Sequence, residues 1–207
     1  GDYYDCFAID DNNWGVVIGD VAGHGVSAGL MMAMAKAGVI MASDAEKRDP
    51  SALVMRLHKI FFAIKNEKLK RMMTLQYFVF NLKTGQFSFA NAGHCFPVLV
   101  KPAEKKADYL EHVATPLGIG KKPKYANYDF VIAPGESLVL YSDGMAEANN
   151  SEGEAFGYNR LKDLLQTVWN NDPEVYYQRI FAAYQDWASS ADDDLTLIII
   201  NRKNDKI

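Results

Sequence analysis

Strand-like and helix-like patterns occupy separate runs of this chain, and that separation limits its fold more than any other feature. Strand patterns joined by short turns cover residues 3–10, 14–19, 74–101, 125–132, 137–142 and 195–203. Helical patterns cover residues 27–44, 49–70, 159–170 and 173–188. Short turns can join antiparallel strands, whereas parallel strands need long crossovers. We therefore predict an α+β fold of antiparallel sheets with helices packed outside, and a central position for the apolar last strand.

The composition is that of one globular domain with a slightly acidic balance. The chain has 207 residues, 49% of them hydrophobic, and a formal net charge of −4. We therefore expect a single domain over residues 1–207 and no nucleic-acid partner. The one dense basic cluster, KKPK at 121–124, is interpreted as a solvated loop, with a phosphate-binding patch as the alternative. Because no apolar run reaches the roughly 20 residues that cross a bilayer, we predict a cytoplasmic fragment without membrane contact.

The first residues and the cysteines bear on the setting of the domain. The chain begins directly with GDYYD, without a methionine, which predicts a piece of a longer protein with an upstream sensor domain. Cys6 and Cys95 show neither a disulfide framework nor metal-ligand spacing, as is typical of a reducing compartment. Neither cysteine begins a Cys-x5-Arg loop, so a cysteine nucleophile is not indicated.

Aspartates stand at four predicted strand ends. They are Asp2, Asp20, Asp143 and the three aspartates at 192–194. A single aspartate at a turn has a structural explanation, because its side chain bonds nearby backbone N–H groups. Four of them suggest a shared site, in which converging carboxylates need a cation to balance their charge. Hard oxygen ligands favour Mg²⁺ or Mn²⁺, so a metal centre is our hypothesis, although spacing alone does not establish that the four converge.

A glycine-containing turn follows Asp20, in the sequence DVAGHG at 20–25. Small residues let the backbone turn tightly, so the Val21 carbonyl could offer an oxygen to a metal beside Asp20. The alternative is a simple strand-to-helix turn in which Asp20 serves as a helix N-cap. His24 and His94 are interpreted as turn or supporting residues rather than as general acids.

Six motifs occur in a fixed order along the chain. They are GDYYD at 1–5, GDVAGHG at 19–25, ANAGHCFP at 90–97, TPLGI at 115–119, LYSDGMAEANNSEGEAFG at 140–157 and DDLTLIII at 193–200. Together they closely resemble the SpoIIE/RsbU-like branch of the PPM-type metal-dependent serine/threonine protein phosphatases, over essentially the whole chain. The resemblance implies an antiparallel β-sandwich of two sheets flanked by helix pairs, with a two-metal site at one edge. The family's first strand, which precedes GDYYD, is lacking here.

The resemblance also assigns site residues. The positions that match metal ligands of the family are Asp2, Asp20, Val21, Asp143 and Asp193. Asp20 would bridge both ions, and Val21 would contribute its backbone carbonyl. Thr196 sets the register of the last motif, so that Asp193 matches the ligand and Asp192 is expected in a solvated turn. The polar loop that follows Asp143 is expected to face the substrate.

The implied reaction is hydrolysis of phosphoserine or phosphothreonine by a hydroxide that bridges two Mn²⁺ or Mg²⁺ ions. Asp20, Asp143 and Asp193 would be the catalytic residues. The implied substrate is a phosphorylated regulatory protein of the anti-anti-sigma (STAS-like) type, and the domain would be the output end of a bacterial signalling protein that could form a homodimer. A catalytically weak partner-binding module and a small-molecule phosphoesterase are the alternatives; a deep apolar pocket would favour the latter.

Overall fold

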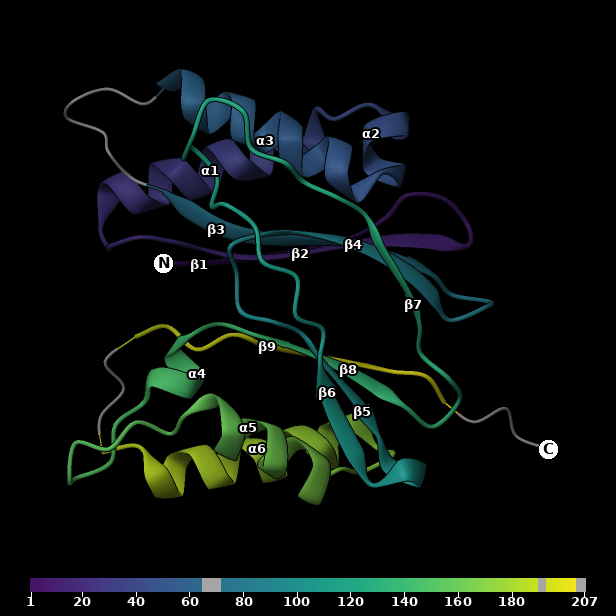
Figure 1. Ribbon diagram of the computed structural model, residues 1–207, viewed down its shortest axis with the longest axis vertical. Helices are drawn as coiled ribbons and strands as arrows, with labels where there is room; N and C mark the ends of the chain where they lie inside the picture. Colours follow the sequence, from purple (N-terminus) through teal and green to yellow (C-terminus); the bar gives the residue numbers. More distant parts are fainter. Residues whose placement is uncertain (65–71, 190–192, 204–207) are drawn as a thin grey trace. The chain divides into compact units, whose positions relative to one another are not determined.

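The computed structural model describes residues 1–64, 72–189 and 193–203, and it divides into two compact units. The first unit comprises Gly1–His94 and His112–Val131, and the second comprises Cys95–Glu111 and Ile132–Ile207. Each unit has its own antiparallel sheet, helices and hydrophobic core, as the ribbon in Figure 1 shows.

The first unit is built on a five-stranded antiparallel sheet. Its strands, in spatial order, are β1 (Asp2–Ala8), β2 (Asn13–Val21), β3 (Met73–Asn81), β4 (Gln86–Ala92) and β7 (Tyr128–Val131). The helices of this unit are α1 (Val26–Ile40), α2 (Asp44–Arg48) and α3 (Pro50–Ile64), and they cover one face of the sheet (Figure 1). The other face carries an aromatic cluster in which Phe78 stacks on Phe89.

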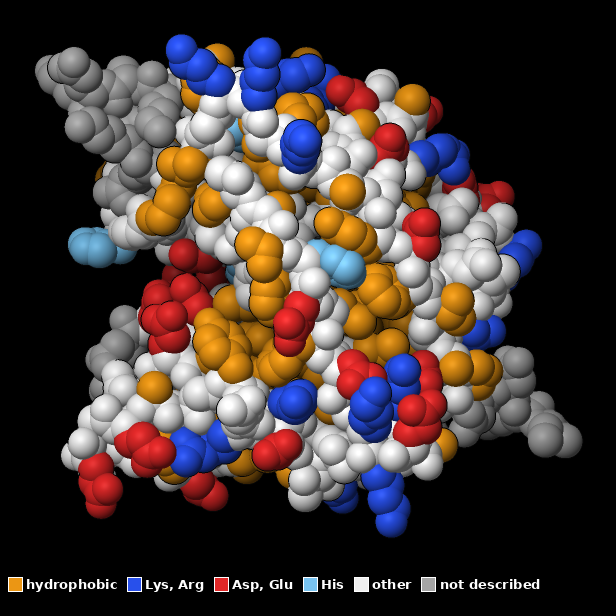
Figure 2. Space-filling model, viewed as in Figure 1, with side chains coloured by type: hydrophobic (Ala, Val, Ile, Leu, Met, Phe, Trp, Pro, Cys, Tyr) orange, Lys and Arg blue, Asp and Glu red, His pale blue; other side chains and the backbone are white. Residues whose placement is uncertain are grey.

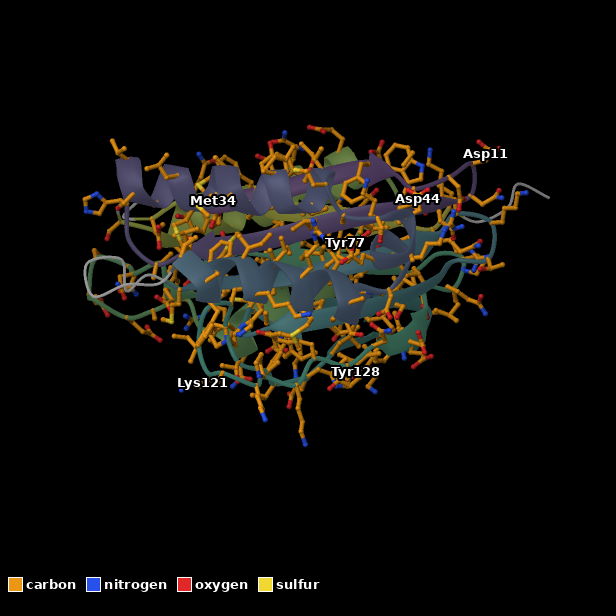
Figure 3. The ribbon with its side chains drawn as sticks, turned by 90° about the horizontal axis from the view of Figure 1, so that it is seen from above. Asp11, Met34, Asp44, Tyr77, Lys121 and Tyr128 are labelled. Carbon is orange, nitrogen blue, oxygen red and sulfur yellow. The ribbon has the colours of Figure 1, made fainter. Side chains whose placement is uncertain are left out.

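The core of the first unit lies between its helices and its sheet. Tyr77 of β3 is fully buried there, and seen from above it lies between α1 and α3 (Figure 3). Its hydroxyl donates a hydrogen bond of 2.6 Å to the Lys47 carbonyl, which ties α2 to the sheet. Leu53, Leu57 and Phe61 of α3 fall at helical spacing and are buried in the same core.

The second unit has a four-stranded antiparallel sheet. Its strands, in spatial order, are β6 (Lys106–Tyr109), β5 (Val98–Lys101), β8 (Ser137–Tyr141) and β9 (Leu197–Asn201). The 3₁₀ helix η1 (Pro102–Glu104) joins β5 to β6, and the α-helices are α4 (Gly144–Glu147), α5 (Tyr158–Thr167) and α6 (Pro173–Trp187). Leu161 of α5 and Tyr176 of α6 pack against Val139 of β8 in one core.

The predicted α+β class with two antiparallel sheets and helices is confirmed. The prediction of a central last strand was wrong, because β9 pairs with β8 alone among the described strands and forms the sheet edge. All of its residues are half-buried, so partial cover of an edge strand produced the continuous apolar pattern. The helix expected over 27–44 ends at Ile40, and α2 begins separately at Asp44. The helix expected over 49–70 is observed to Ile64, and 65–71 lie outside the described residues.

No helix within the described ranges combines the length and the hydropathy that crossing a bilayer requires.

Candidate metal centre

Asp2 and Asp20 stand directly opposite each other at one end of the first sheet. The register of β1 and β2 pairs the two residues, and Asp20 is paired with Thr74 of β3 on its other side. Side chains of directly opposed residues project from the same face of a sheet, so the two carboxylates form a pair. Asp20 lies within β2, while α1 starts at Val26 with Gly25 as its N-cap, so the helix-cap interpretation of Asp20 was wrong.

Three oxygens beside this pair lie around one point, the position of the Gly1 nitrogen. That nitrogen is 3.0 Å from Asp20 Oδ1, 3.3 Å from the Val21 carbonyl oxygen and 3.2 Å from the Gly23 carbonyl oxygen. A carboxylate and backbone carbonyls are the hard donors that Mg²⁺ and Mn²⁺ prefer. The oxygens of Asp20, Val21 and Gly23 are thus of the type that a divalent cation takes, and the role of Asp20 and Val21 as metal ligands stays a prediction.

The backbone on both sides of Asp20 is closely packed. A Cβ atom on Gly19 would lie 2.4 Å from the Thr74 carbonyl oxygen, so only glycine fits before Asp20. Thr74 Oγ1 lies 2.9 Å from Nδ1 of the buried His94 and 3.5 Å from the Asp20 carbonyl. His94 thus supports the strand that carries Asp20, as expected for a supporting residue, whereas His24 is exposed.

Asp143 and Asp193 form the corresponding pair in the second unit. Asp143 follows β8 and precedes α4, and its side chain makes no capping hydrogen bond to that helix. A Cβ atom on Gly144 would lie 2.4 Å from the Asp194 carbonyl oxygen and 3.5 Å from Asp193 Cβ. The chain carrying Asp193 therefore packs directly against the residue that follows Asp143.

Two hydrogen bonds fix the register of this second pair. The Ser142 amide donates to the Thr196 carbonyl at 3.0 Å, and the Thr196 amide donates to Ser142 Oγ at 2.9 Å. Because Ser142 adjoins Asp143 and Thr196 lies three residues after Asp193, these bonds hold the two aspartate segments side by side. Asp193 Oδ1 also accepts from the Asp194 amide at 2.8 Å, which orients its carboxylate. Asp192 lies outside the described residues.

The loop after Asp143 is pinned to α5 and α6. Asn149 and Ala155 form an isolated β-bridge that closes the loop. The Arg160 guanidinium donates to the carbonyls of Ala155 at 3.2 Å and Phe156 at 2.9 Å, and it lies 3.8 Å from the centre of the Trp187 ring. A cation over an indole face at this distance is an attractive contact. The polar loop predicted at this place is therefore attached through Arg160.

The predicted site residues thus occur as two pairs, one in each unit. Among residues 1–64, 72–189 and 193–203, no group of three or more His, Cys, Asp or Glu side chains is arranged to hold a metal. The structure places Asp2 beside Asp20, and the segment of Asp143 beside that of Asp193. That all four serve one centre stays a prediction.

Comparison with known proteins connects this chain to one family. A family model described as "Stage II sporulation protein E (SpoIIE)" matches residues 10–203. The chain belongs to the SpoIIE family.

Relatives of this SpoIIE-family chain include a named phosphatase. The chain is 27% identical to "Phosphoserine phosphatase RsbU" of Bacillus subtilis (strain 168) over 207 residues, which cover 98% of the chain and 59% of RsbU. It is 26% identical to "Protein IcfG" of Synechocystis over 228 residues, which cover 98% of the chain and 36% of IcfG. The chain therefore spans a third to three fifths of these relatives.

A solved structure confirms the fold of this SpoIIE-family chain. The SiaA-PP2C domain of Pseudomonas aeruginosa matches with a TM-score of 0.82 and 23% identity, covering 97% of this chain and 80% of that one. RsbX, whose structure is described in complex with magnesium, matches with a TM-score of 0.70 and 20% identity, covering 96% of this chain and 85% of that one. The fold is that of PP2C-type phosphatase domains.

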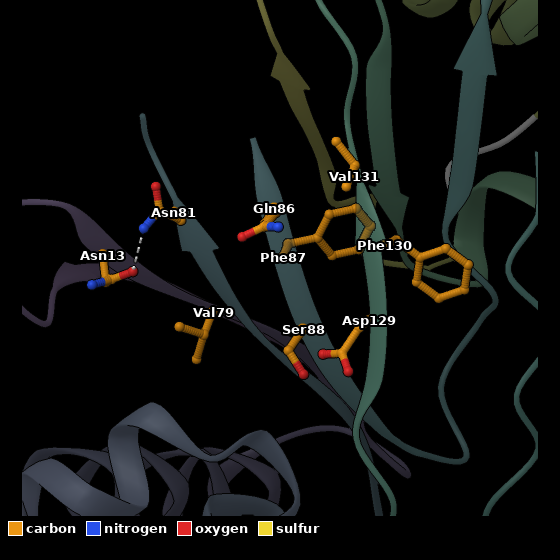
Figure 4. Close-up of a pocket in the computed structure, with 9 residues that line it drawn as sticks. All are labelled: Asn13, Val79, Asn81, Gln86, Phe87, Ser88, Asp129, Phe130 and Val131. Carbon is orange, nitrogen blue, oxygen red and sulfur yellow. Dashed lines mark hydrogen bonds between the residues drawn. The ribbon is translucent and has the colours of Figure 1, made fainter. Parts of the chain in front are cut away.

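A separate pocket of the SpoIIE-family chain lies at the other end of the first sheet. It has a volume of about 550 Å³ and is open to solvent. Its polar lining includes Asn13, Asn81, Ser88 and Asp129, which Figure 4 shows on neighbouring strands. Asn13 and Asn81 are paired at the start of β2, whereas Asp20 is near its end. With one carboxylate and mixed polar walls, this pocket fits neither the metal centre nor a deep apolar substrate site.

Cys95 of the SpoIIE-family chain is not poised as a nucleophile. Burial, with a further contribution from the charge of Asp143, raises the pKa of its thiol to about 12. A thiol with such a pKa stays protonated at neutral pH and is a weak nucleophile. Cys95 is therefore a poor candidate for a nucleophile.

Proposed function

We propose that this SpoIIE-family domain hydrolyses phosphoserine or phosphothreonine on a regulatory protein, using Mn²⁺ or Mg²⁺. The observation that carries the proposal is that the Asp20, Val21 and Gly23 oxygens lie around one position beside Asp2. Membership of the family of phosphoserine phosphatase RsbU supports the reaction class. An anti-anti-sigma protein is the substrate that we expect from the resemblance.

The residues of the proposed site would either bind the ions or position the residues that do. Asp2, Asp20, Asp143 and Asp193 would hold the ions, and the Val21 carbonyl would complete the position beside Asp20. Two bound divalent ions would neutralise the phosphoryl charge and make water a stronger nucleophile. Thr74, supported by His94, keeps the Asp20 strand in place, and Ser142 with Thr196 keeps the Asp143 and Asp193 segments aligned.

In the proposed reaction, water adds to phosphorus and the ester bond to the serine or threonine oxygen breaks. That oxygen takes up a proton, and inorganic phosphate is released, so no phosphorylated enzyme forms. The protonated Cys95 agrees with this direct route.

Phosphate release tests the proposal. Wild type should hydrolyse an aryl phosphate and a phosphoserine peptide with Mn²⁺ but not with a chelator. Asp20→Asn removes one carboxylate charge from the cation position and should lower turnover on the order of a hundredfold or more. Asp11→Asn is the matched control, since Asp11 is exposed in the turn between β1 and β2, away from Asp20 (Figure 3). Equal turnover of Asp20→Asn and wild type contradicts the proposal.

A further inference from the structure

We propose that Lys59, Lys121, Lys122 and Lys124 form a docking patch for an acidic segment of the protein substrate. This inference rests on the proposed function and adds a substrate class to it. Figure 2 shows Lys and Arg side chains gathered along the upper edge of the first unit, over α3 and the loop beside it. All four lysines are exposed, as the interpretation of KKPK as a solvated loop requires. The inference adds a binding role to that loop.

Within the described part of the chain, no acidic side chain neutralises these lysines. None of the four forms an ion pair with another described residue, whereas Lys36, Arg48 and Arg56 of the same unit pair with acidic side chains. Although the net charge of the chain is −4, four lysines without an ion pair among the described residues give this surface a local positive field. Seen from above, α3 lies between α1 and Lys121, so the patch faces away from α1 (Figure 3).

The loop that carries three of the lysines is anchored by a buried histidine. The Gly118 amide donates to Nδ1 of His58 on α3 at 3.3 Å, and the Tyr125 hydroxyl lies 3.2 Å from the same nitrogen. Tyr125 also donates to the Thr115 carbonyl at 3.0 Å, so the loop is fixed at both of its ends. Anchoring of this kind lowers the ordering cost of binding, because the lysines are already held on one surface.

The sheet register connects the loop to the metal end of the first unit. Leu117 is bridged to Met73 through an amide-to-carbonyl bond of 2.8 Å, and Met73 is paired with Val21, next to Asp20. Two strand spacings separate Leu117 from Val21, which is roughly 10 Å. The lysines begin four residues after Leu117, so they lie within reach of residues that flank a phosphoserine bound near Asp20.

A short acidic protein segment fits this patch better than a nucleic acid or an anionic membrane does. A nucleic-acid site with about six to ten phosphate contacts is larger than this patch. The basic clusters of about four to eight Lys or Arg that bind anionic membranes lie beside a membrane-spanning helix or on an amphipathic helix, whereas Lys121, Lys122 and Lys124 lie in a loop. Four lysines on a net acidic chain match a few carboxylates of a partner protein. Charged groups at such a rim mainly accelerate and orient encounter, so their contribution appears in KM and in its salt dependence.

Two peptides test the inference. One carries phosphoserine followed, after about five residues, by a run of Asp and Glu, and the other carries Asn and Gln in the same run. Wild type at low salt should show a KM lower by about fivefold or more for the acidic peptide, with similar kcat for both. The double variant Lys121→Glu/Lys122→Glu should lose this difference and keep its turnover of an aryl phosphate.

Lys83→Glu/Lys105→Glu is the matched control, because it changes the net charge equally at exposed positions elsewhere. Lys83 lies in the turn after β3, at the opposite end of that strand from Met73. This control should keep the preference for the acidic peptide. Equal KM values for the two peptides with the wild type, or an unchanged preference in the Lys121→Glu/Lys122→Glu variant, overturn the inference while aryl phosphate turnover still supports the proposed function.

Direct binding separates the other partner classes. If wild type binds anionic lipid vesicles or duplex DNA through Lys121 and Lys122 but does not discriminate between the peptides, the patch serves a membrane or a nucleic acid and the inference is wrong. If the aryl phosphate is not hydrolysed at all, the proposed function fails, and peptide binding measured without turnover still decides the docking role.

Discussion

Gly19 precedes Asp20 and Gly144 follows Asp143, two of the predicted metal ligands, and neither glycine has room for a methyl group. In both cases the nearest atom to the missing Cβ is a backbone carbonyl oxygen at 2.4 Å, on Thr74 and on Asp194 respectively. Backbone atoms cannot move aside as a flexible side chain can, so glycine is needed for packing at both positions. The two glycines thus set how closely the aspartate segments approach their neighbours.

Gly144→Ala should therefore damage both stability and activity. The added methyl group pushes away the backbone at Asp193 and Asp194, and overpacking of this kind costs about 1–3 kcal/mol of unfolding free energy. Urea unfolding and aryl phosphate hydrolysis at varied Mn²⁺ measure the two effects. Gly29→Ala, where no atom lies within 4 Å of the new Cβ, is the control and should retain full activity. Wild-type metal dependence in Gly144→Ala would show that the close packing is dispensable.

His58 should make the stability of the protein depend on pH. Burial lowers its pKa below the usual 6.5, although a backbone hydrogen bond with Gly120 acts in the opposite direction. The unfolded chain therefore takes up a proton before the folded chain does, so this part of the stability is complete above about pH 6.5 and is lost as pH falls through the folded pKa. His112 has a lowered pKa for the same reason and contributes in the same window.

Chemical unfolding at pH 7.5 and pH 5 measures this effect. His58→Asn keeps an acceptor that can face the Gly118 amide but does not titrate, so the loss of stability between the two pH values should be smaller than in wild type. His24→Asn is the control, because His24 is exposed and should leave the loss unchanged. An equal loss in wild type and His58→Asn would exclude His58 as a source of the pH dependence.

At the scale of elements, α1 shows how small residues serve two different purposes. Gly38 faces α3, where a Cβ atom would lie 2.6 Å from Leu57 Cδ2 and 3.0 Å from Ile60 Cδ1. Gly29 faces open space on the same helix. The first glycine therefore allows the two helices to approach closely, whereas the second only weakens the helix.

Alanine substitutions separate these purposes. Gly29→Ala should raise the unfolding free energy by about 0.5–1 kcal/mol, because alanine restricts the unfolded chain and favours the helix. Gly38→Ala gains the same propensity but must displace Leu57 and Ile60, so a net loss of roughly 1 kcal/mol is expected. Thermal or urea unfolding of both variants measures the contrast. Equal stabilisation by both would mean that α1 and α3 have room to separate.

Elements differed in how well the sequence predicted them. Alternating segments such as 3–10 and 14–19 were found as β1 and β2 within a few residues, because hydrophobic alternation and a DNN turn coincide there. β6 was missed since its sequence, KADY, is short and largely polar. The edge position of β9 could not be read from composition, because an edge strand that is half-buried along its whole length looks like a central one.

The structure places the predicted aspartates in two pairs, and their role as metal ligands stays a prediction. Asp2 with Asp20, and Asp143 with Asp193, were identified through ordered motifs, since spacing along the chain gives no distance between strand ends. The Gly23 carbonyl was missed because a backbone oxygen has no residue type of its own. Its only signal is the glycine itself, whose φ of 91° lets the turn direct that carbonyl toward the position beside Asp20.

At the scale of the whole molecule, the proposed function requires that all four aspartates serve one metal centre. A ligand that binds only the folded state raises its stability by an amount set by concentration and affinity. Mn²⁺ should therefore raise the melting temperature of wild type, and a chelator should reverse the change. The rise in melting temperature does not depend on turnover, so it can be measured without the natural substrate.

A single shared centre makes a specific prediction for variants in the two units. Asp20→Asn and Asp143→Asn should each remove most of the Mn²⁺-dependent rise in melting temperature, although their residues belong to different units. Asp11→Asn should keep the full rise. If one aspartate variant loses the rise and the other keeps it entirely, the two pairs act separately and a joint centre is wrong.

The contact between Arg160 and Trp187 gives the molecule an intrinsic optical reporter. The Trp187 indole donates to the Ala148 carbonyl at 3.2 Å and carries the guanidinium that holds the loop after Asp143. Its fluorescence therefore depends on whether that loop is attached. With Trp14 and Trp169 replaced by phenylalanine, emission from Trp187 alone would follow detachment of the loop in real time while a substrate enters or leaves.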